Sequence, residues 1–465
     1  MKIIFVFIAF FAILFSCAPQ QKVPENERIM VYEKNPHYFA YKGAPVLLLG
    51  GSDEDNLFNN PELMMRNFKT LEKIGGNYVR CTMSSRDSGN VWAFAKNSDG
   101  LYDLNVFNPE YWRRFENCLH EAAARDIIVQ VEIWATFDFY RDFWLANPFN
   151  PQNNINYSTE NTRLQTEWPY HPARKPQPFV FSIPAKNNDM QVLQYQRKFV
   201  DKLTSISFKY GNVLYCMDNE TRAPAEWAWF WGNYVLQKAK KSGIPVLLTE
   251  MWDAHNLHNE EHKRTYDHPE LFAFFDISQN NWQEGQMHYD NALWARELVQ
   301  LHGGVRPLTN IKVYQRREHG KPNDPFVGLD RWWQNIFAGC AATRFHRPTG
   351  GTGLNALSQK AIKAARIFTN AFDVFSCDPH PELLSRREAN EAYCLANPGK
   401  EYAVYFPHGG NVILTIENPN LRMQENWFNP ETGEFLDAKN IMSETTIRLA
   451  SPDTLQAWLV LVRNP

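Results

Sequence analysis

The sequence predicts an α/β fold, a (β/α)₈ TIM barrel followed by a small antiparallel β-sandwich. Short apolar runs alternate with amphipathic segments eight times over roughly 320 residues, as expected for this barrel with insertions. Several of these runs end abruptly in polar residues, as barrel strands do at an active-site face. A doubly wound open sheet is the alternative, but no Gly-x-Gly-x-x-Gly motif follows the first strand.

The barrel elements are predicted in order along the chain. A hairpin of residues 30–33 and 38–41 opens the domain and is expected to plug the barrel floor. Barrel strands are expected at 46–51, 77–82, 127–134, 212–220, 245–250, 274–279, 307–314 and 342–348. Helices are expected at 61–74, 109–125, 225–241, 329–339 and 358–372. Residues 138–190 are an insertion rich in Asn, Pro, Tyr and Trp that should wall the active-site face.

The pattern changes after Cys377 to short strands separated by turn signals. These strands are expected at 391–396, 401–406, 411–416, 423–428, 445–449 and 456–462. Their spacing is typical of a small antiparallel sandwich. The predicted domains are therefore a barrel over 29–377 and a sandwich over 378–465.

The N-terminus is typical of a secretory signal, with Met1-Lys2 followed by an apolar run too short to cross a bilayer. Leu14-Phe15-Ser16-Cys17 resembles a bacterial lipoprotein signal, in which Cys17 becomes the lipidated first residue. An ordinary signal peptide is the alternative. We therefore expect a signal over 1–17, a tether over 18–28, and an extracytoplasmic protein lipid-anchored to a bacterial membrane, on its outer-membrane or periplasmic side.

Composition excludes one class of partner and favours another. The net charge of −3 does not suit a nucleic-acid-binding protein. The aromatic content of 14% with 15 Trp favours sugar binding, although large cores also use aromatic residues. The scattered cysteines form no CxxC pair, so we expect mostly buried thiols and neither a disulfide framework nor a zinc site.

The predicted strand ends supply the candidate chemistry. The stretch Asn212-Val-Leu-Tyr-Cys-Met-Asp-Asn-Glu220 ends in Asp218, Asn219 and Glu220, although Glu220 could instead cap the following helix. Other strand ends carry Asp53, Asp55, Arg80, Glu132, Trp134, Glu250, Trp252, Asp253, Asp276, Gln279, Asn280, Trp282, Asn310, Lys312, Tyr314, His346 and Arg347. Such a mixture suits a polyhydroxylated ligand, and a pair of carboxyl groups can cleave a glycosidic bond.

These residues resemble the large clan of (β/α)₈ retaining glycoside hydrolases. The clan places an Asn-Glu acid/base at the end of strand four and an Arg at the end of strand two, which Asn219-Glu220 and Arg80 match. The tail resembles the "putative collagen-binding domain" found behind apiosidase-like glycoside hydrolases. Tyr402-Ala-Val-Tyr-Phe-Pro-His-Gly-Gly and Trp427-Phe-Asn-Pro-Glu-Thr-Gly carry that second resemblance.

Strand seven departs from the clan, because Lys312 falls where the nucleophilic Glu is expected. Glu250 is the next partner for Glu220, and Asp253 follows the same strand. The sequence thus predicts an O-glycosyl hydrolase with Glu220 as general acid, its pKa raised by neighbours such as Asp218. We expect this hydrolase to need no cofactor. The expected substrate-binding residues are Arg80, Asn219, Trp134, Trp252, Asn280, Trp282, Lys312 and His346.

Two alternatives remain open. One is a non-catalytic carbohydrate-binding barrel, motivated by Lys312. The other is metal-dependent hydrolysis, motivated by histidines and acids after strand five. These are His255, His258, Glu260, Glu261 and His262.

Overall fold

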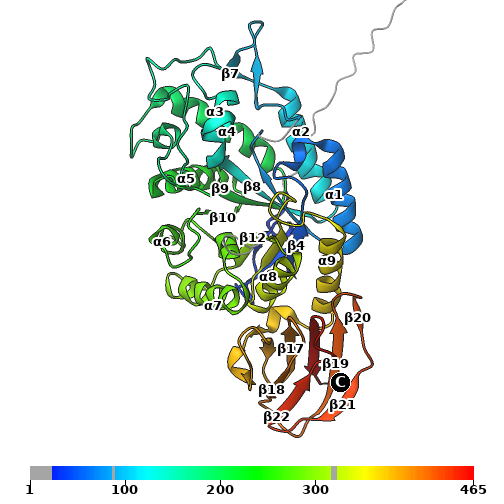
Figure 1. The fold of residues 1–465 in the computed structure, drawn as a ribbon. Helices are drawn as coiled ribbons and strands as arrows, with labels where there is room; N and C mark the ends of the chain where they lie inside the picture. The colour runs from blue at the N-terminus through cyan, green and yellow to red at the C-terminus, as the bar shows by residue number, and fades with distance from the viewer. Residues whose placement is uncertain (1–22, 86–88, 316–321, 465) are drawn as a thin grey trace, which may run out of the picture.

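The computed structural model describes residues 23–85, 89–315 and 322–464. Its centre is a parallel sheet that forms a nearly closed barrel (Figure 1), so the predicted TIM barrel is confirmed. The strand order is β10-β9-β8-β5-β4-β13-β12-β11. The strands are β4 (Leu48–Gly51), β5 (Tyr78–Thr82), β8 (Ile128–Ala135), β9 (Val213–Asn219), β10 (Leu248–Thr249), β11 (Phe275–Asp276), β12 (Leu308–Val313) and β13 (Ala342–Phe345).

The two outermost strands of this order, β10 and β11, are shorter than predicted. The Thr249 hydroxyl donates to the Phe274 carbonyl at 2.8 Å, and the Ala273 amide donates to the Leu248 carbonyl at 3.0 Å. These bonds join the strands at their beginnings. Beyond Asp276 the chain turns into the 3₁₀ helix η5 (Ser278–Trp282), because the Asp276 carboxylate accepts from the Ser278 amide at 2.9 Å.

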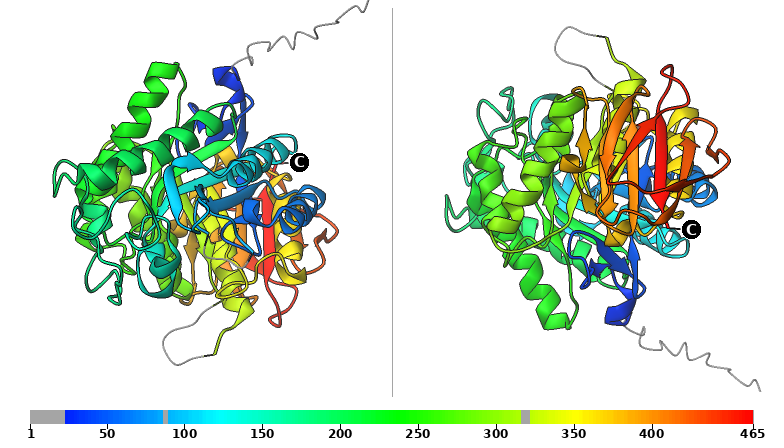
Figure 2. Two further views of the ribbon diagram at one scale, coloured as in Figure 1. Left: turned by 90° about the horizontal axis from the view of Figure 1, so that it is seen from above. Right: turned by 90° about the horizontal axis from the view of Figure 1, so that it is seen from below.

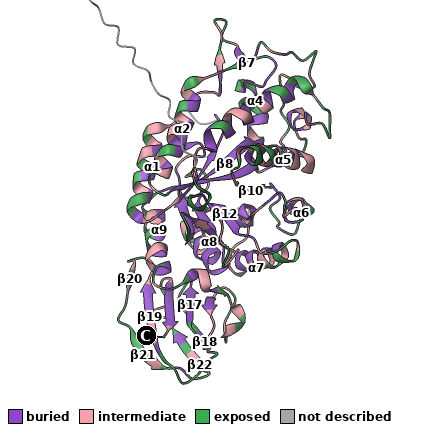
Figure 3. Cartoon of the chain, turned by 180° about the vertical axis from the view of Figure 1, so that it is seen from behind, coloured by how far each residue is buried: buried purple, intermediate pink, exposed green. Residues whose placement is uncertain are grey.

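Helices surround the barrel, with buried residues on their inner faces and exposed ones outside (Figure 3). They are α1 (Pro61–Ile74), α2 (Pro109–Ala123), α3 (Arg141–Ala146), α4 (Met190–Ser207), α5 (Ala225–Ser242), α6 (Glu260–Tyr266), α7 (Gly285–Leu301), α8 (Pro325–Phe337) and α9 (Ala356–Thr369). The bounds of α1 match the prediction, because Asn60 caps its start and Gly75, with φ 77°, ends it. Helix α7 was missed, since it begins without a side-chain cap.

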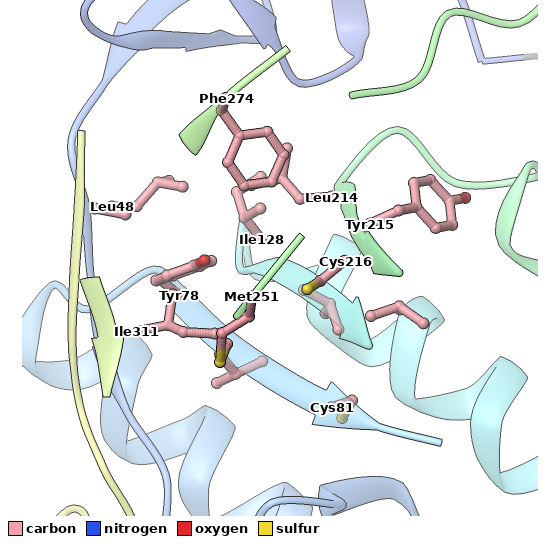
Figure 4. Close-up of a cluster of buried hydrophobic side chains, with 14 of the residues drawn as sticks. Leu48, Tyr78, Cys81, Ile128, Leu214, Tyr215, Cys216, Met251, Phe274 and Ile311 are labelled. Carbon is pink, nitrogen blue, oxygen red and sulfur yellow. The ribbon is translucent and has the colours of Figure 1, made fainter. Parts of the chain in front are cut away.

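The barrel core combines an apolar cluster with buried polar and charged side chains such as Arg80 and Glu132. Side chains from the central strands, among them Leu48, Ile128, Leu214 and Ile311, meet in one buried cluster (Figure 4). The opening segment forms three strands instead of a two-stranded hairpin. They are β1 (Met30–Val31), β2 (Phe39–Tyr41) and β3 (Ala44–Val46), and Phe39 packs edge-on against Phe274 at 5.6 Å between ring centroids. A second hairpin, β6 (Phe94–Lys96) and β7 (Tyr102–Phe107), was not predicted.

The C-terminal part forms two antiparallel sheets at one end of the barrel, and Figure 2 shows them from below. The larger contains β14 (Asp378–Pro379), β16 (Tyr393–Asn397), β17 (Glu401–Phe406), β23 (Trp458–Arg463), β19 (Arg422–Asn429), β20 (Glu434–Phe435) and β21 (Lys439–Met442). The smaller contains β15 (Leu384–Ser385), β18 (Asn411–Thr415) and β22 (Thr446–Ala450).

The central strands of the larger sheet, β16, β17 and β23, are buried on both faces. Tyr402 and Val404 of β17 belong to the sandwich core, while Ala403 and Tyr405 belong to the barrel core. This alternation follows from the two-residue period of a strand. The Tyr405 hydroxyl also donates to Asp330 of α8 at 3.0 Å. The two domains therefore share a hydrophobic interface.

We expect Phe368→Ala to weaken that interface. The Phe368 ring is fully buried and lies 5.4 Å from the ring centroid of Phe428 in the sandwich. Its truncation should lower the free energy of unfolding by about 3–5 kcal/mol, measured by urea denaturation. Phe326→Ala on α8, a site 61% exposed, is the control and should stay within about 0.5 kcal/mol. Equal effects in the two variants would contradict a packed junction.

Candidate active site

The site begins at the turn that ends β9. Glu220 has a left-handed backbone with φ 54°, a conformation that non-glycine residues adopt at a cost. Two backbone hydrogen bonds hold the turn, from the Thr221 amide to the Met251 carbonyl at 2.8 Å and from the Asp253 amide to the Thr221 carbonyl at 3.1 Å. The strained residue therefore carries the carboxyl group that the sequence singled out.

Buried carboxyl groups fix the strand end beneath this turn. Asp218 accepts from the amide and the hydroxyl of Thr136, each at 2.8 Å. Glu250 Oε1 accepts from the amides of Asp218 at 2.9 Å and Met251 at 2.8 Å. Burial raises the pKa of Asp218 to about 6 and that of Glu250 well above its usual value. Glu250 is thus engaged with backbone and does not line the cavity described next.

A cavity of about 430 Å³ lies over Glu220. Its wall combines aromatic rings with charged and polar side chains, a composition that suits a small polar ligand. The lining residues are Phe137, His171, Ala173, Glu220, Arg222, Asp253, His255, Gln279, Trp282, Tyr314, His346, Arg347, Thr349 and Gly350. The insertion reaches the cavity through His171 and Ala173, as predicted.

Lys312 of β12 lies against Glu220. Its ammonium Nζ is 2.8 Å from Glu220 Oε1 and donates to Asn219 Oδ1 at 2.5 Å. Gln279 Nε2 donates to the same Glu220 oxygen at 3.0 Å. Burial raises the pKa of Glu220, but Lys312, Arg80 and Gln279 outweigh it and lower that pKa below its usual value. The expectation that neighbours such as Asp218 raise the pKa of Glu220 is wrong, because the ammonium lies in direct contact.

Asp253, which follows β10, is the second carboxyl group in the cavity wall. Burial and the negative charge of Glu220 raise the pKa of Asp253 to about 6, although its ion pair with Arg222 opposes this. The Arg222 Nε atom lies 3.0 Å from Asp253 Oδ2. The two carboxyl groups of the cavity are therefore shifted in opposite directions.

Two of the expected substrate-binding residues, Trp282 and His346, line the cavity, together with the predicted strand-end residues Gln279, Tyr314 and Arg347. Trp282 stacks against His255, with ring centroids 4.1 Å apart and planes at 17°. His346 packs edge-on against Tyr314 at 4.6 Å, and burial lowers the pKa of its imidazole well below the usual value. Both residues stand beside Glu220, as their positions at strand ends suggested.

Other predicted residues lie away from the cavity wall. Trp134 packs among buried rings such as Phe199 and Trp231, at 5.3 and 5.2 Å between centroids. The Trp252 indole donates to the Thr265 hydroxyl at 2.8 Å.

Asn280 and Arg80 also serve buried networks. Asn280 Nδ2 donates to the His288 carbonyl at 2.7 Å. Arg80 is fully buried between Asp55 at 3.0 Å and Glu132 at 3.3 Å.

Several cavity residues were not singled out by the sequence. Phe137 and His171 belong to irregular segments, where no periodicity marks a side chain as inward-facing. Arg222 follows Glu220 by two residues. Proximity to a predicted strand end was the available signal for Arg222.

The histidines considered for a metal site point to different partners. His255 stacks on Trp282, and His258 lies over Trp294 at 3.7 Å between centroids. His262 Nε2 is hydrogen-bonded to the Ala254 carbonyl at 2.9 Å. Within the described ranges, no three His, Cys, Asp or Glu side chains converge as a metal ion would require. The six cysteines in those ranges are buried free thiols, and no described helix has the length and apolarity to cross a bilayer.

We expect Arg80→Leu to act mainly on stability. The substitution leaves Asp55 and Glu132 as buried carboxylates without this cation, which should cost about 3–5 kcal/mol in unfolding free energy. The exposed ion pair of Arg113 with Glu110, at 2.8 Å, offers a control, since Arg113→Leu should cost about 1 kcal/mol or less. Denaturant titration of both variants makes the comparison. A stable Arg80 variant would show that the buried pairs are dispensable.

Comparison with known proteins agrees with this architecture. Residues 379–463 match the family model described as "Putative collagen-binding domain of a collagenase". No curated protein matches the sequence significantly.

Solved structures share the fold over nearly the whole chain. A glycoside hydrolase aligns with a TM-score of 0.63 at 12% identity, covering 94% of this chain and 97% of that chain. A family 5 glycoside hydrolase from Bacteroides vulgatus aligns with a TM-score of 0.61 at 14% identity, covering 94% of each chain. The chain thus has a TIM barrel like those of glycoside hydrolase family 5, followed by a domain of the matched C-terminal family.

Proposed function

We propose that the protein is a glycoside hydrolase that cleaves O-glycosidic bonds in oligosaccharides or polysaccharide fragments. One observation carries the proposal: Glu220 and Asp253 line one cavity with pKa values shifted in opposite directions. Hydrolysis of a glycosidic bond uses two carboxyl groups, one protonated and one ionised.

The two pKa shifts suggest which carboxyl group acts as the acid and which as the nucleophile or base. Asp253, whose raised pKa favours the protonated form, would donate a proton to the glycosidic oxygen. Glu220, held as a carboxylate, would act as nucleophile or as base toward water, a role different from the general acid predicted by the sequence. Glu250 remains the sequence's predicted partner, but Asp253 is the carboxyl group that faces the cavity. Carboxyl groups about 5 Å apart suit retention, and about 6.5–9.5 Å inversion.

The remaining wall residues suit sugar binding. The aromatic rings of Phe137, Trp282 and Tyr314 offer faces for the apolar side of a sugar ring. The side chains of Gln279 and Arg222 present donors for hydroxyl groups.

A non-catalytic carbohydrate-binding barrel is the second candidate. The ion pair between Lys312 and Glu220 favours it, because a carboxylate engaged at 2.8 Å by an ammonium is a weaker base or nucleophile. Such a protein would bind glycans without turnover.

Product release from an oligosaccharide panel separates these candidates. We expect wild type to release sugar and Glu220→Gln to lose about 10²–10⁴-fold in kcat/KM. Glu260→Gln, at a side chain 83% exposed on α6, is the matched control and should keep full activity. Binding without turnover by wild type would favour the carbohydrate-binding barrel, and an active Glu220→Gln would exclude Glu220 as the reacting group.

The pH dependence tests the assigned roles. Activity should fall as the pH rises through about 6, where Asp253 loses its proton, and again at acidic pH where Glu220 gains one. Asp253→Asn should abolish the loss of activity at alkaline pH and should lower kcat/KM most for substrates with sugar leaving groups. It should lower kcat/KM little for substrates with nitrophenyl leaving groups, which depart without a proton. Equal losses on both substrate types would argue against Asp253 as proton donor.

We also propose that Cys17 is lipidated and anchors the protein to a bacterial membrane; this residue lies outside the described ranges. Labelled palmitate should enter wild type but not Cys17→Ala when each is expressed in a bacterium, and the variant should leave the membrane fraction. The cysteine at 394 offers the control Cys394→Ala, which should keep the label. Labelling of Cys17→Ala would contradict the proposal.

A further inference from the structure

Lys312 is a buried cation directly beneath the cavity. It belongs to β12, is 1% exposed, and is not itself part of the cavity wall. Lysine is almost never fully buried unless it is paired, because an unpaired ammonium loses its hydration. Its Nζ atom meets two oxygens from the end of β9, Glu220 Oε1 at 2.8 Å and Asn219 Oδ1 at 2.5 Å.

The left-handed turn explains how one ammonium reaches both side chains. Asn219 and Glu220 are consecutive, and consecutive side chains of a regular strand point to opposite faces. With φ at 54°, Glu220 leaves the strand geometry, so its carboxylate can lie on the same side as the Asn219 amide. Lys312 thus ties the end of β9 to β12 across the barrel mouth.

We propose that Lys312 is a positioning residue that holds Glu220 as an oriented carboxylate at the cavity, so that Glu220 and Asp253 enter the reaction in different protonation states. The proposal rests on the function proposed above. Burial acts to raise the pKa of both acids in the cavity, and Lys312 is the strongest group that opposes this effect at Glu220. The Lys312 ammonium makes the two acids different, because it contacts Glu220 directly and favours the ionised form of that residue.

The other groups around Glu220 do not replace this contact. Arg80 of β5 also acts on the carboxylate, but it is paired with Asp55 and Glu132. Tyr314, which directly follows β12, offers a hydroxyl at 3.5 Å, and Gln279 of η5 an uncharged amide at 3.0 Å.

The negative charge of Glu220 shifts the pKa values of two further titratable groups. They are Asp253 after β10 and His171 of the insertion. The negative charge of Asp253 would disfavour an ionised Glu220, and burial lowers the pKa of His171, so neither substitutes for the Lys312 ammonium.

The test is a carbon-13 NMR titration of the glutamate side chains, with the Glu220 signal assigned by its absence in Glu220→Gln. In wild type, its midpoint should lie below the roughly 4.3 of an unperturbed Glu. Lys312→Met should raise it by about 1–3 pH units, the usual effect of an adjacent opposite charge. Lys312→Arg should keep most of the lowering. Lys240→Met, at an exposed lysine of α5, should leave the midpoint unchanged.

A wild-type midpoint above 4.3 would overturn the proposal even if the methionine variant fails to fold. An unchanged midpoint in a folded Lys312→Met would also overturn it. Kinetics add a second readout, because the acidic limb of kcat/KM should move to higher pH in Lys312→Met and return with Lys312→Arg. If the acidic limb stays in place while the alkaline limb moves to higher pH, Glu220 is the proton donor and the proposal fails. A shift of the acidic limb to lower pH would also overturn the proposal. If the titration midpoints are as expected but the wild type releases no sugar, the role of Lys312 in holding Glu220 ionised stands and only the hydrolase function is refuted.

Discussion

The left-handed backbone at Glu220 is the constraint on which the candidate site depends. A strand that continued regularly would turn the carboxyl group of Glu220 away from the Asn219 amide. The surrounding structure keeps this conformation through the backbone hydrogen bonds that the next residue, Thr221, forms with Met251 and Asp253. Strain of this kind persists only where neighbours over-determine it, and it gathers at functional sites.

Buried carboxyl groups below the cavity serve the backbone rather than a ligand. Glu250 accepts two amide hydrogens and Asp218 accepts from Thr136, so each replaces a missing strand partner where the parallel ladder ends. Their raised pKa values follow from burial, which outweighs the hydrogen bonds that favour the ionised form. The carboxyl groups that line the cavity are instead Glu220 and Asp253.

The C-terminal sandwich adds stability to the barrel from the outside. The central strands of its larger sheet are apolar on both faces, because one face closes the sandwich and the other covers helices α8 and α9. A sheet buried in this way cannot be removed without exposing rings of the barrel to water. The family model matched to this segment describes it by a collagen-binding name, but its visible role in this chain is packing against the barrel.

The sequence by itself determined the architecture, because periodicity and turn residues are local properties. The run before Glu220, the Asn60 cap and the Gly75 stop each mark an element without reference to the rest of the chain. It also placed Glu220, Trp282 and His346 at the cavity, since parallel strands deliver their ends to one face. Only the tertiary structure decided between Glu250 and Asp253. Only two residues lie between them. Which one faces the cavity depends on Glu250 turning inward to the amides of Asp218 and Met251, and the bond to Asp218 is a long-range pairing that no local pattern encodes. The proposed role of Lys312 was likewise visible only in the tertiary structure, because it depends on contacts with Asn219 and Glu220 on the opposite side of the barrel mouth.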